Sequence, residues 1–248
     1  MRILVLAAGK GSRLKPYTDT VNKCMIPIAG CPLLQRNLLQ CLQAVPEVSE
    51  IVFVVGYRKE QIQNYFGTSF QGIKIRYIHQ KKLDGIAGAV ALAANALQGE
   101  PFLMTLGDEL LWKPNLTEMV ESFSKTDVDG LCGVLPGKSL TEIRNNYSVH
   151  ITQEGLIDQL VEKPTVPFND LMGLGYCIMQ TSTLPYAMET PVSPERQQRE
   201  FCDWLLLCIQ QGLHFRPFRA GQGVVNLNSV QDLEELEKRF TGTAEDEA

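Results

Sequence analysis

The stretch Arg2-Ile-Leu-Val-Leu-Ala-Ala-Gly-Lys-Gly-Ser-Arg-Leu14 joins a short apolar run to a loop that contains two glycines. The run at residues 3–7 has the length and composition of a buried β-strand. Similar runs follow at residues 51–55, 73–78 and 102–106, and helical patterns lie between the runs at residues 33–42, 59–66 and 86–97. Buried strands that alternate with helices predict a parallel sheet covered on both faces. Ligands of such sheets bind beyond the carboxyl ends of the strands. The loop after Ala7 and the residues after Leu106 are therefore candidate binding regions.

The second half of the chain has a different pattern. Strands are predicted at residues 131–135, 147–151, 156–162 and 173–179 and near 223–228, and helices at residues 200–210 and 229–240. Gln153-Glu154-Gly155 has the composition of a hairpin turn. The predicted fold class is therefore α/β: a single Rossmann-like domain with a mostly parallel mixed sheet flanked by helices and an inserted antiparallel part. This domain is expected to span residues 1–240, and the small, acidic residues 241–248 to form a disordered tail.

The composition excludes several classes of protein. The chain has 248 residues, a formal net charge of -5, 44% hydrophobic and 21% charged residues, which argues against a disordered chain, a collagen or a coiled coil. The acidic balance is unfavourable for sequence-independent binding of nucleic acid. The longest weakly polar stretch, residues 86–97, is too short to span a bilayer, which takes about 20 residues. We therefore expect neither a nucleic acid nor a membrane as a partner.

The cysteines and the first residues indicate a cellular location. The seven cysteines are scattered, and no two have the CxxC spacing that is typical of zinc sites. They are expected to be free thiols in a reducing compartment. The chain starts with a strand-like run instead of a signal peptide, so we expect a cytoplasmic protein.

The loop after the first strand has the character of a phosphate-binding site. Gly9 and Gly11 allow the backbone to approach a ligand closely, and successive N–H groups of such a loop can surround an anion. Basic residues gather in and after this loop: Lys10, Arg13, Lys15 and Lys23. Local positive charge in an acidic chain favours a polyphosphate as the ligand.

Two known phosphate-binding motifs do not fit this loop. A Walker A loop has four residues between its glycines, whereas only Lys10 separates Gly9 from Gly11. A dinucleotide-binding loop needs glycine at the position of Leu14 and an acid near the end of the second strand, but the next acid is Glu60. A nicotinamide oxidoreductase is therefore disfavoured, and an ordinary glycine-rich turn is left as the structural alternative.

A longer pattern resembles one family. Residues 6–18, Leu-Ala-Ala-Gly-Lys-Gly-Ser-Arg-Leu-Lys-Pro-Tyr-Thr, followed by Lys23 and Pro27, resemble the signature of the sugar-phosphate nucleotidyltransferases, which include glucose-1-phosphate thymidylyl- and uridylyltransferases. The resemblance continues in chain order at Gln80 and at residues 85–89, 106–108, 162–164 and 225–226. It implies a nucleotidyltransferase domain that uses Mg²⁺ to join a nucleoside triphosphate to a sugar 1-phosphate and releases pyrophosphate.

The resemblance also implies roles for individual residues. Arg13 and Lys23 would be catalytic: Arg13 would hold the triphosphate and Lys23 would bridge the reacting phosphates. The implied nucleotide contacts are Leu6, Ala7, Ala8, Gly9, Gly11, Gln80, Gly85 and Asp108, the acceptor contacts are Glu162, Lys163, Asn169 and Gly173, and the metal ligands are Asp108 and Asn226. The attacking phosphate oxygen is ionised at neutral pH, so this reaction requires alignment and charge neutralisation rather than a strong base.

The base and the acceptor stay open at this point. Gln80 can both donate and accept hydrogen bonds, which favours the pyrimidine of UTP or dTTP, although relatives use CTP or GTP. Many relatives have Tyr-Gly where this chain has Tyr147-Ser148. A non-sugar acceptor such as choline phosphate or a phosphonate, used with CTP, is therefore an alternative.

The metal site differs from the family pattern as well. Asn226 stands where an acid is common, which leaves a catalytically weak regulatory or binding protein as an alternative, with Glu109 or Asn228 as substitute metal ligands. Arg199 is a candidate phosphate contact. Relatives form dimers or tetramers, so a second copy of the chain is a further candidate partner.

Overall fold

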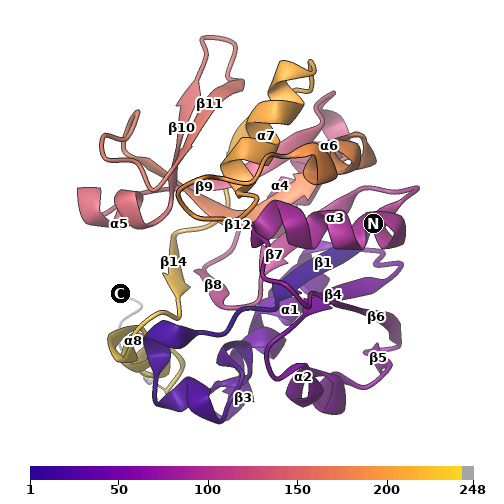
Figure 1. Ribbon diagram of the computed structural model, residues 1–248, viewed down its shortest axis with the longest axis vertical. Coiled ribbons are helices and arrows are strands. Elements are labelled where there is room, and N and C mark those ends of the chain that lie inside the picture. The colour runs from indigo at the N-terminus through magenta and orange to yellow at the C-terminus, as the bar shows by residue number, and fades with distance from the viewer. Residues whose placement is uncertain (242–248) are drawn as a thin grey trace.

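A mixed β-sheet with helices on both faces forms the body of the protein, as shown by the computed structural model, which describes residues 1–241 (Figure 1). The parallel centre of the sheet consists of β7 (Phe102–Leu106), β1 (Arg2–Ala7), β4 (Ile51–Val55) and β6 (Ile73–His79), with short β5 (Ser69–Phe70) at the edge. The second half adds β12 (Leu171–Met179), antiparallel to β7, and then β9 (Gly130–Pro136), β10 (Tyr147–Ile151), β11 (Ile157–Glu162) and β13 (Phe215–Arg219). The predicted α/β class, with an antiparallel part joined to a parallel sheet, is confirmed.

Three helices cover each face of the sheet. One face is covered by α1 (Leu33–Ala44), α2 (Lys59–Phe66) and α4 (Leu116–Lys125), and the other by α3 (Gly85–Leu97), α6 (Leu184–Glu189) and α7 (Phe201–Gln210). Successive side chains of a strand point to opposite faces, so Ile3 and Val5 of β1 pack into the first layer and Leu4 into the second. The remaining short helix, α5 (Leu140–Asn145), precedes β10.

The C-terminal elements return to the loop after β1. Strand β14 (Gly223–Asn226) pairs antiparallel with β8 (Glu109–Trp112), and α8 (Val230–Thr241) follows it. A small apolar core joins this unit to the N-terminal segment, which contains three short 3₁₀ turns and the β2–β3 hairpin (Pro27–Ile28, Cys31–Pro32). Leu14 and Ile26 pack there with Val225 and Leu236, and Figure 1 shows yellow α8 beside the indigo N-terminal segment. Residues 226–228 are thereby brought to the carboxyl edge of the sheet.

Most predicted elements are present. Every predicted strand and helix is found with small shifts at its ends, and the hairpin turn at residues 153–155 joins β10 to β11. The elements that were not predicted are β8, β13, α4, α5 and α6, together with short strands and 3₁₀ turns. The predicted tail, residues 241–248, lies outside the described residues except for Thr241, which ends α8.

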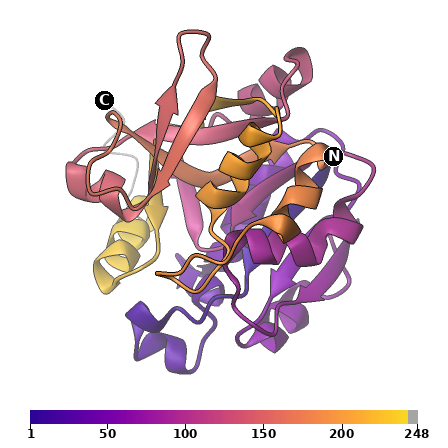
Figure 2. The ribbon, with the colours of Figure 1, turned by 45° about the horizontal axis from the view of Figure 1, so that its top comes forward.

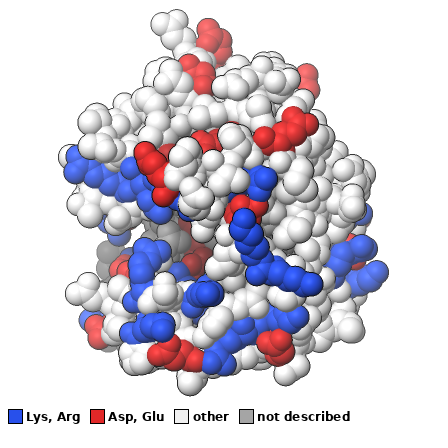
Figure 3. All heavy atoms as spheres, viewed as in Figure 1, with Lys and Arg blue, Asp and Glu red and all other residues white. Residues whose placement is uncertain are grey.

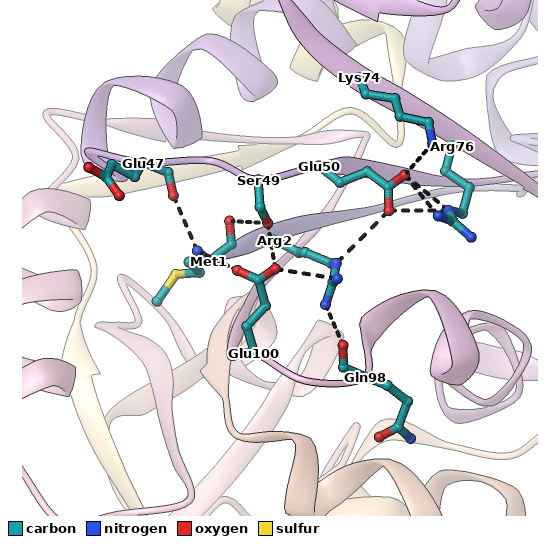
Figure 4. Close-up of polar contacts among 9 residues, drawn as sticks. All are labelled: Met1, Arg2, Glu47, Ser49, Glu50, Lys74, Arg76, Gln98 and Glu100. Atoms are coloured by element: carbon teal, nitrogen blue, oxygen red, sulfur yellow. Dashed lines mark hydrogen bonds and ion pairs between the residues drawn. The ribbon is translucent and has the colours of Figure 1, made fainter.

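A cluster of charged and polar residues links the amino ends of the parallel strands, on the opposite side of the sheet from their carboxyl ends (Figure 4). Glu50, only 7% exposed, lies beside β4 and is paired with Arg76 at 3.1 Å, Lys74 at 3.7 Å and Arg2 at 3.9 Å. Glu100 pairs with Arg2 at 3.3 Å. None of these residues lines either of the two cavities described below. Substitutions here therefore serve as controls for loss of an ion pair remote from the cavities.

All seven cysteines are free thiols, as predicted. Within residues 1–241, no helix has both the length and the apolar composition needed to cross a membrane.

Candidate active site

The loop after β1 is shaped by close packing against Thr18 and Lys23. Gly11 has φ 63°, and a Cβ at this residue would lie 2.9 Å from Lys23 Cβ and 3.0 Å from Thr18 Cγ2. Both the backbone conformation and the available space therefore favour glycine. The Thr18 hydroxyl donates to the Gly11 carbonyl at 2.9 Å, which fixes the loop over the chain that follows it.

Lys23 is held in place by its buried neighbour Asn22. Asn22 Oδ1 accepts from the Cys24 N–H at 2.9 Å and Nδ2 donates to the Tyr57 carbonyl at 2.6 Å. Lys23 is only 8% exposed, and its ammonium group contacts Asp108 Oδ2 and lies 2.9 Å from Asn228 Oδ1. A buried ammonium group with two oxygen partners is a fixed positive charge at the carboxyl edge of the sheet.

Asp108 is positioned from two sides. Asn37 of α1 donates to the carbonyls of Leu106 at 3.1 Å and Glu109 at 2.6 Å, which braces the turn between β7 and β8. The Leu227 N–H donates to the Asp108 carbonyl at 3.0 Å. The turn that carries Asp108 is thereby fastened both to the helix layer and to the segment after β14.

These elements enclose a small cavity of about 230 Å³. Its lining consists of Gly9, Gly11, Ser12, Arg13, Leu14, Lys23, Asp108 and Asn228. Arg13 is exposed, has no hydrogen-bond or ion-pair partner among residues 1–241, and also lines the larger cavity beside it. The structure thus brings Arg13, Lys23 and Asp108 to one hollow, where a free guanidinium can bind an anion.

The larger cavity has a volume of about 840 Å³ and connects the predicted nucleotide and acceptor residues. Its lining includes Leu6, Ala8, Gly9, Gln80, Gly85, Asp108, Glu162, Lys163, Gly173 and Asn226. Figure 3 shows a hollow in this face of the molecule, with basic and acidic side chains at its rim. Two predicted site residues, Ala7 and Asn169, line neither cavity. The Asn169 side chain instead bonds to the Val149 carbonyl at 2.8 Å and the Leu171 N–H at 2.9 Å.

The end of the larger cavity that contains Glu162 and Lys163, the residues predicted to bind the acceptor, is acidic and aromatic. Glu162 ends β11, and its pKa is raised by burial and by the nearby charge of Glu200. Lys163 has φ 49°, and its N–H donates to the Asn146 carbonyl at 2.8 Å. Gly173 lies against the ring of Tyr147, which leaves no room for a larger residue. Asn146 and Glu200 line this end without any signal in the sequence that singles them out.

Glu109 is the most deeply buried acid in the site. It is 1% exposed, lines the larger cavity, and accepts a hydrogen bond from the Gly175 N–H through Oε2 at 2.8 Å. Burial raises its pKa to about 8, opposed by the Gly175 bond and reinforced by the charge of Asp108. The Gly107-Asp108-Glu109 order shows that an acid follows Asp108, but only the structure shows that this acid is enclosed.

Comparison with known proteins gives a consistent result. The model of the family described as "Nucleotidyl transferase" matches residues 2–221. The UTP–glucose-1-phosphate uridylyltransferase AglF of Haloferax volcanii is 28% identical over 241 residues, which cover 97% of this chain and 96% of that protein. The bifunctional protein GlmU of Methanocaldococcus jannaschii is 32% identical over 211 residues, or 85% of this chain and 47% of that protein, so the chain spans about half of its length.

A solved structure has the same fold. A UDP-glucose pyrophosphorylase complexed with UDP-glucose superposes with a TM-score of 0.86 over 97% of this chain and 98% of that chain. The two sequences are 22% identical, so this likeness is evidence for the fold.

Proposed function

Because this chain belongs to the nucleotidyl transferase family, we propose that it transfers the nucleotidyl group of UTP or dTTP to a sugar 1-phosphate, with Mg²⁺, and releases pyrophosphate. The observation that carries this proposal is the single cavity that reaches from Gln80 and Gly85 to Glu162 and Lys163. It is large enough for two substrates to meet in it. The uridylyltransferase from Haloferax volcanii, whose name specifies UTP and glucose 1-phosphate, supports the same assignment.

The charged residues suit an attack of one phosphate on another. An acceptor phosphate oxygen attacks the α-phosphorus of the triphosphate, the bond to the β-phosphate oxygen breaks, and pyrophosphate leaves. Arg13 is free to bind the triphosphate, Lys23 offers a positive charge beside the reacting phosphates, and Lys163 faces the acceptor end. Such groups lower the barrier by holding the phosphates in line and by neutralising charge that develops on the leaving group.

The oxygen donors near Asp108 fit a magnesium ion. Mg²⁺ prefers carboxylate and other oxygen ligands, and it keeps several waters or phosphate oxygens of its own. Asp108 offers carboxylate oxygen Oδ1 beside the Oδ2 that contacts Lys23, and Asn226 offers an amide oxygen on the segment that is bonded to Asp108 through Leu227. The amide oxygen of Asn228 on the same segment accepts from Lys23. Asn226 Nδ2 donates to Asn146 at 3.4 Å, which leaves Asn226 Oδ1 without a partner among residues 1–241. When bound, the ion would neutralise phosphate charge.

The Gln80 side chain supports a uracil or thymine base. Gln80 Nε2 donates to the Gly85 carbonyl at 3.3 Å, so Oε1 is left as the acceptor at the cavity wall. Uracil and thymine carry an N3–H donor, whereas N3 of cytosine is itself an acceptor. A glutamine held in this orientation can therefore accept the N3–H of UTP or dTTP.

The departure at Ser148 is not a reason to prefer a non-sugar acceptor. Ser148 is fully buried, its hydroxyl accepts from the Phe168 N–H at 3.0 Å, and it lines neither cavity. The side chain that replaces glycine here therefore does not fill the space offered to the acceptor.

Pyrophosphate release by the purified protein tests the proposal. UTP, dTTP, CTP and GTP are each combined with glucose 1-phosphate, other sugar 1-phosphates, choline phosphate and a phosphonate, with Mg²⁺. We expect release with UTP or dTTP together with a sugar 1-phosphate. Release only with CTP and a non-sugar acceptor would contradict the substrate assignment, and no release in any combination would contradict the proposed activity.

Replacing Asn226 by aspartate is expected to lower the Mg²⁺ concentration needed for half-maximal rate by roughly tenfold, because a charged ligand replaces a neutral one. The measurement is the rate of pyrophosphate release as a function of Mg²⁺ concentration. Asn145→Asp is the matched control, since Asn145 lines the same cavity and receives the same charge. Equal shifts in both variants would point to the general field of an added charge and against Asn226 as a ligand.

A further inference from the structure

The segment between α6 and α7 forms part of the wall of the larger cavity. We call residues 193–200 of this segment the strap. Gln198 and Glu200 of the strap line the cavity, as does Gly85 at the start of α3. Within the strap, the Ser193 N–H donates to the Gln198 carbonyl at 2.8 Å. Figure 2 shows this orange segment as a projecting loop that returns toward the body of the molecule.

Arg199 fastens the strap to the start of α3 through both its backbone and its side chain. Its N–H donates to the Asp84 carbonyl at 3.1 Å, and its carbonyl accepts from the Ala87 N–H at 3.2 Å. The guanidinium pairs with the Asp84 carboxylate, and Nε donates to the Thr190 carbonyl at 2.9 Å. Four contacts from one residue thus join the strap to the helix start and to the end of α6.

Gly85 makes this close approach sterically feasible. Its φ is 76°, and a Cβ built on it would collide with the carbonyl oxygen of Arg199. Gln80 in turn donates to the Gly85 carbonyl. Of the two residues that are candidates for reading the base, Gly85 is therefore packed directly against the strap, and Gln80 is bonded to Gly85.

The strap also reaches the other end of the cavity. Glu200 follows Arg199 directly and pairs with Arg196 of the strap at 3.8 Å, and Arg196 also donates to the Glu162 carbonyl at 3.4 Å. Arg199 itself lines neither cavity, and its guanidinium is engaged with protein atoms. This geometry does not support the expectation that Arg199 contacts a phosphate.

We infer that Arg199 is a positioning residue that couples the nucleotide end of the cavity to the acceptor end by holding the strap against α3. The inference rests on the proposed function, because it assigns two substrates to the two ends. A strap that spends part of the time detached reduces the fraction of molecules that can bind, and the apparent affinity for each substrate falls by that fraction. Both substrates use the same strap, so both affinities are expected to fall together.

Steady-state kinetics of Arg199→Ala test this coupling. We expect KM to rise roughly tenfold for both the triphosphate and the acceptor, with kcat within about twofold of the wild-type value. Asp84→Asn is expected to act in the same way, and the double variant to add little, because both substitutions remove the same guanidinium–carboxylate pair. Arg76→Ala is the matched control: it removes an arginine from the Glu50 cluster at the opposite edge and is expected to leave both KM values unchanged.

Three kinetic outcomes would overturn the inference: unchanged KM values, a rise for one substrate alone, or an equal rise in Arg76→Ala. Hydrogen exchange in the substrate-free proteins tests the role of Arg199 independently of the proposed function. Residues 84–87 and 193–200 are expected to exchange faster in Arg199→Ala and not in Arg76→Ala. Unchanged exchange in both segments would contradict the role of Arg199 even if wild-type activity is found, and a lack of wild-type activity would contradict the proposed function instead.

Discussion

Replacing Lys23 by alanine is expected to lower the maximal rate of pyrophosphate release by about 100- to 1000-fold, which is the usual cost of removing one donor aimed at transition-state charge. Lys23 carries a buried positive charge between Asp108 and Asn228, where the loop after β1 meets the segment after β14. The geometry of that charge is fixed before substrates arrive. Its loss would therefore act mainly on the chemical step, measured as kcat with saturating triphosphate and acceptor.

Lys10→Ala is the matched control, because Lys10 is an exposed lysine in the same loop and lines neither cavity. It is expected to keep most of the activity.

Arg13→Ala should lose rate in the same range as the Lys23 variant. Because Arg13 has no protein partner among residues 1–241, this loss cannot come from a broken ion pair. Full activity in both the Lys23 and the Arg13 variants would contradict the roles assigned to them.

The central strands were predictable because their own sequences, without knowledge of the neighbouring elements, indicate that they are buried. Residues 51–55 and 102–106 are continuous apolar runs, and such runs are typical of strands that are covered on both faces. β13 was missed because Pro217 cannot donate to a sheet ladder. The proline is tolerated because, among residues 1–241, β13 pairs with β9 alone and has no strand partner on its other side. β8 was missed because its partner, β14, lies more than a hundred residues away in the chain.

The candidate site was predictable only in part, for a related reason. The rule that ligands bind at the carboxyl ends of parallel strands, together with the pattern at residues 6–18, located Arg13, Lys23 and Asp108. Contacts between distant segments have no local signature. The bond from Asn22 to Tyr57, and the approach of Arg199 to Gly85, depend on which loops the fold brings together.

Glu109 shows what the fold adds beyond the motif. Its pKa of about 8 in the folded protein is far above the value of 4.5 for a free glutamate, chiefly because burial penalises the charged form. Between pH 4.5 and pH 8 the folded protein therefore binds one more proton than the unfolded chain. The free energy of unfolding must fall as the pH rises through this interval, by about 1.4 kcal/mol per pH unit from this group. The contribution of Glu109 to the free energy of unfolding is therefore larger below pH 4.5 than above pH 8.

Replacing Glu109 by glutamine is expected to remove this dependence, because glutamine is neutral throughout and its amide oxygen can still accept the Gly175 N–H. At pH 5 the variant and the wild type should have similar free energies of unfolding, whereas at pH 9 the variant should be more stable by on the order of 3–5 kcal/mol. Urea denaturation from pH 5 to pH 9 measures the difference, and Glu118→Gln, on an exposed residue of α4, is the control. A difference between wild type and Glu109→Gln that stays constant over this range would mean that Glu109 does not change its protonation there, and that the enclosed carboxyl group is ionised in the folded protein.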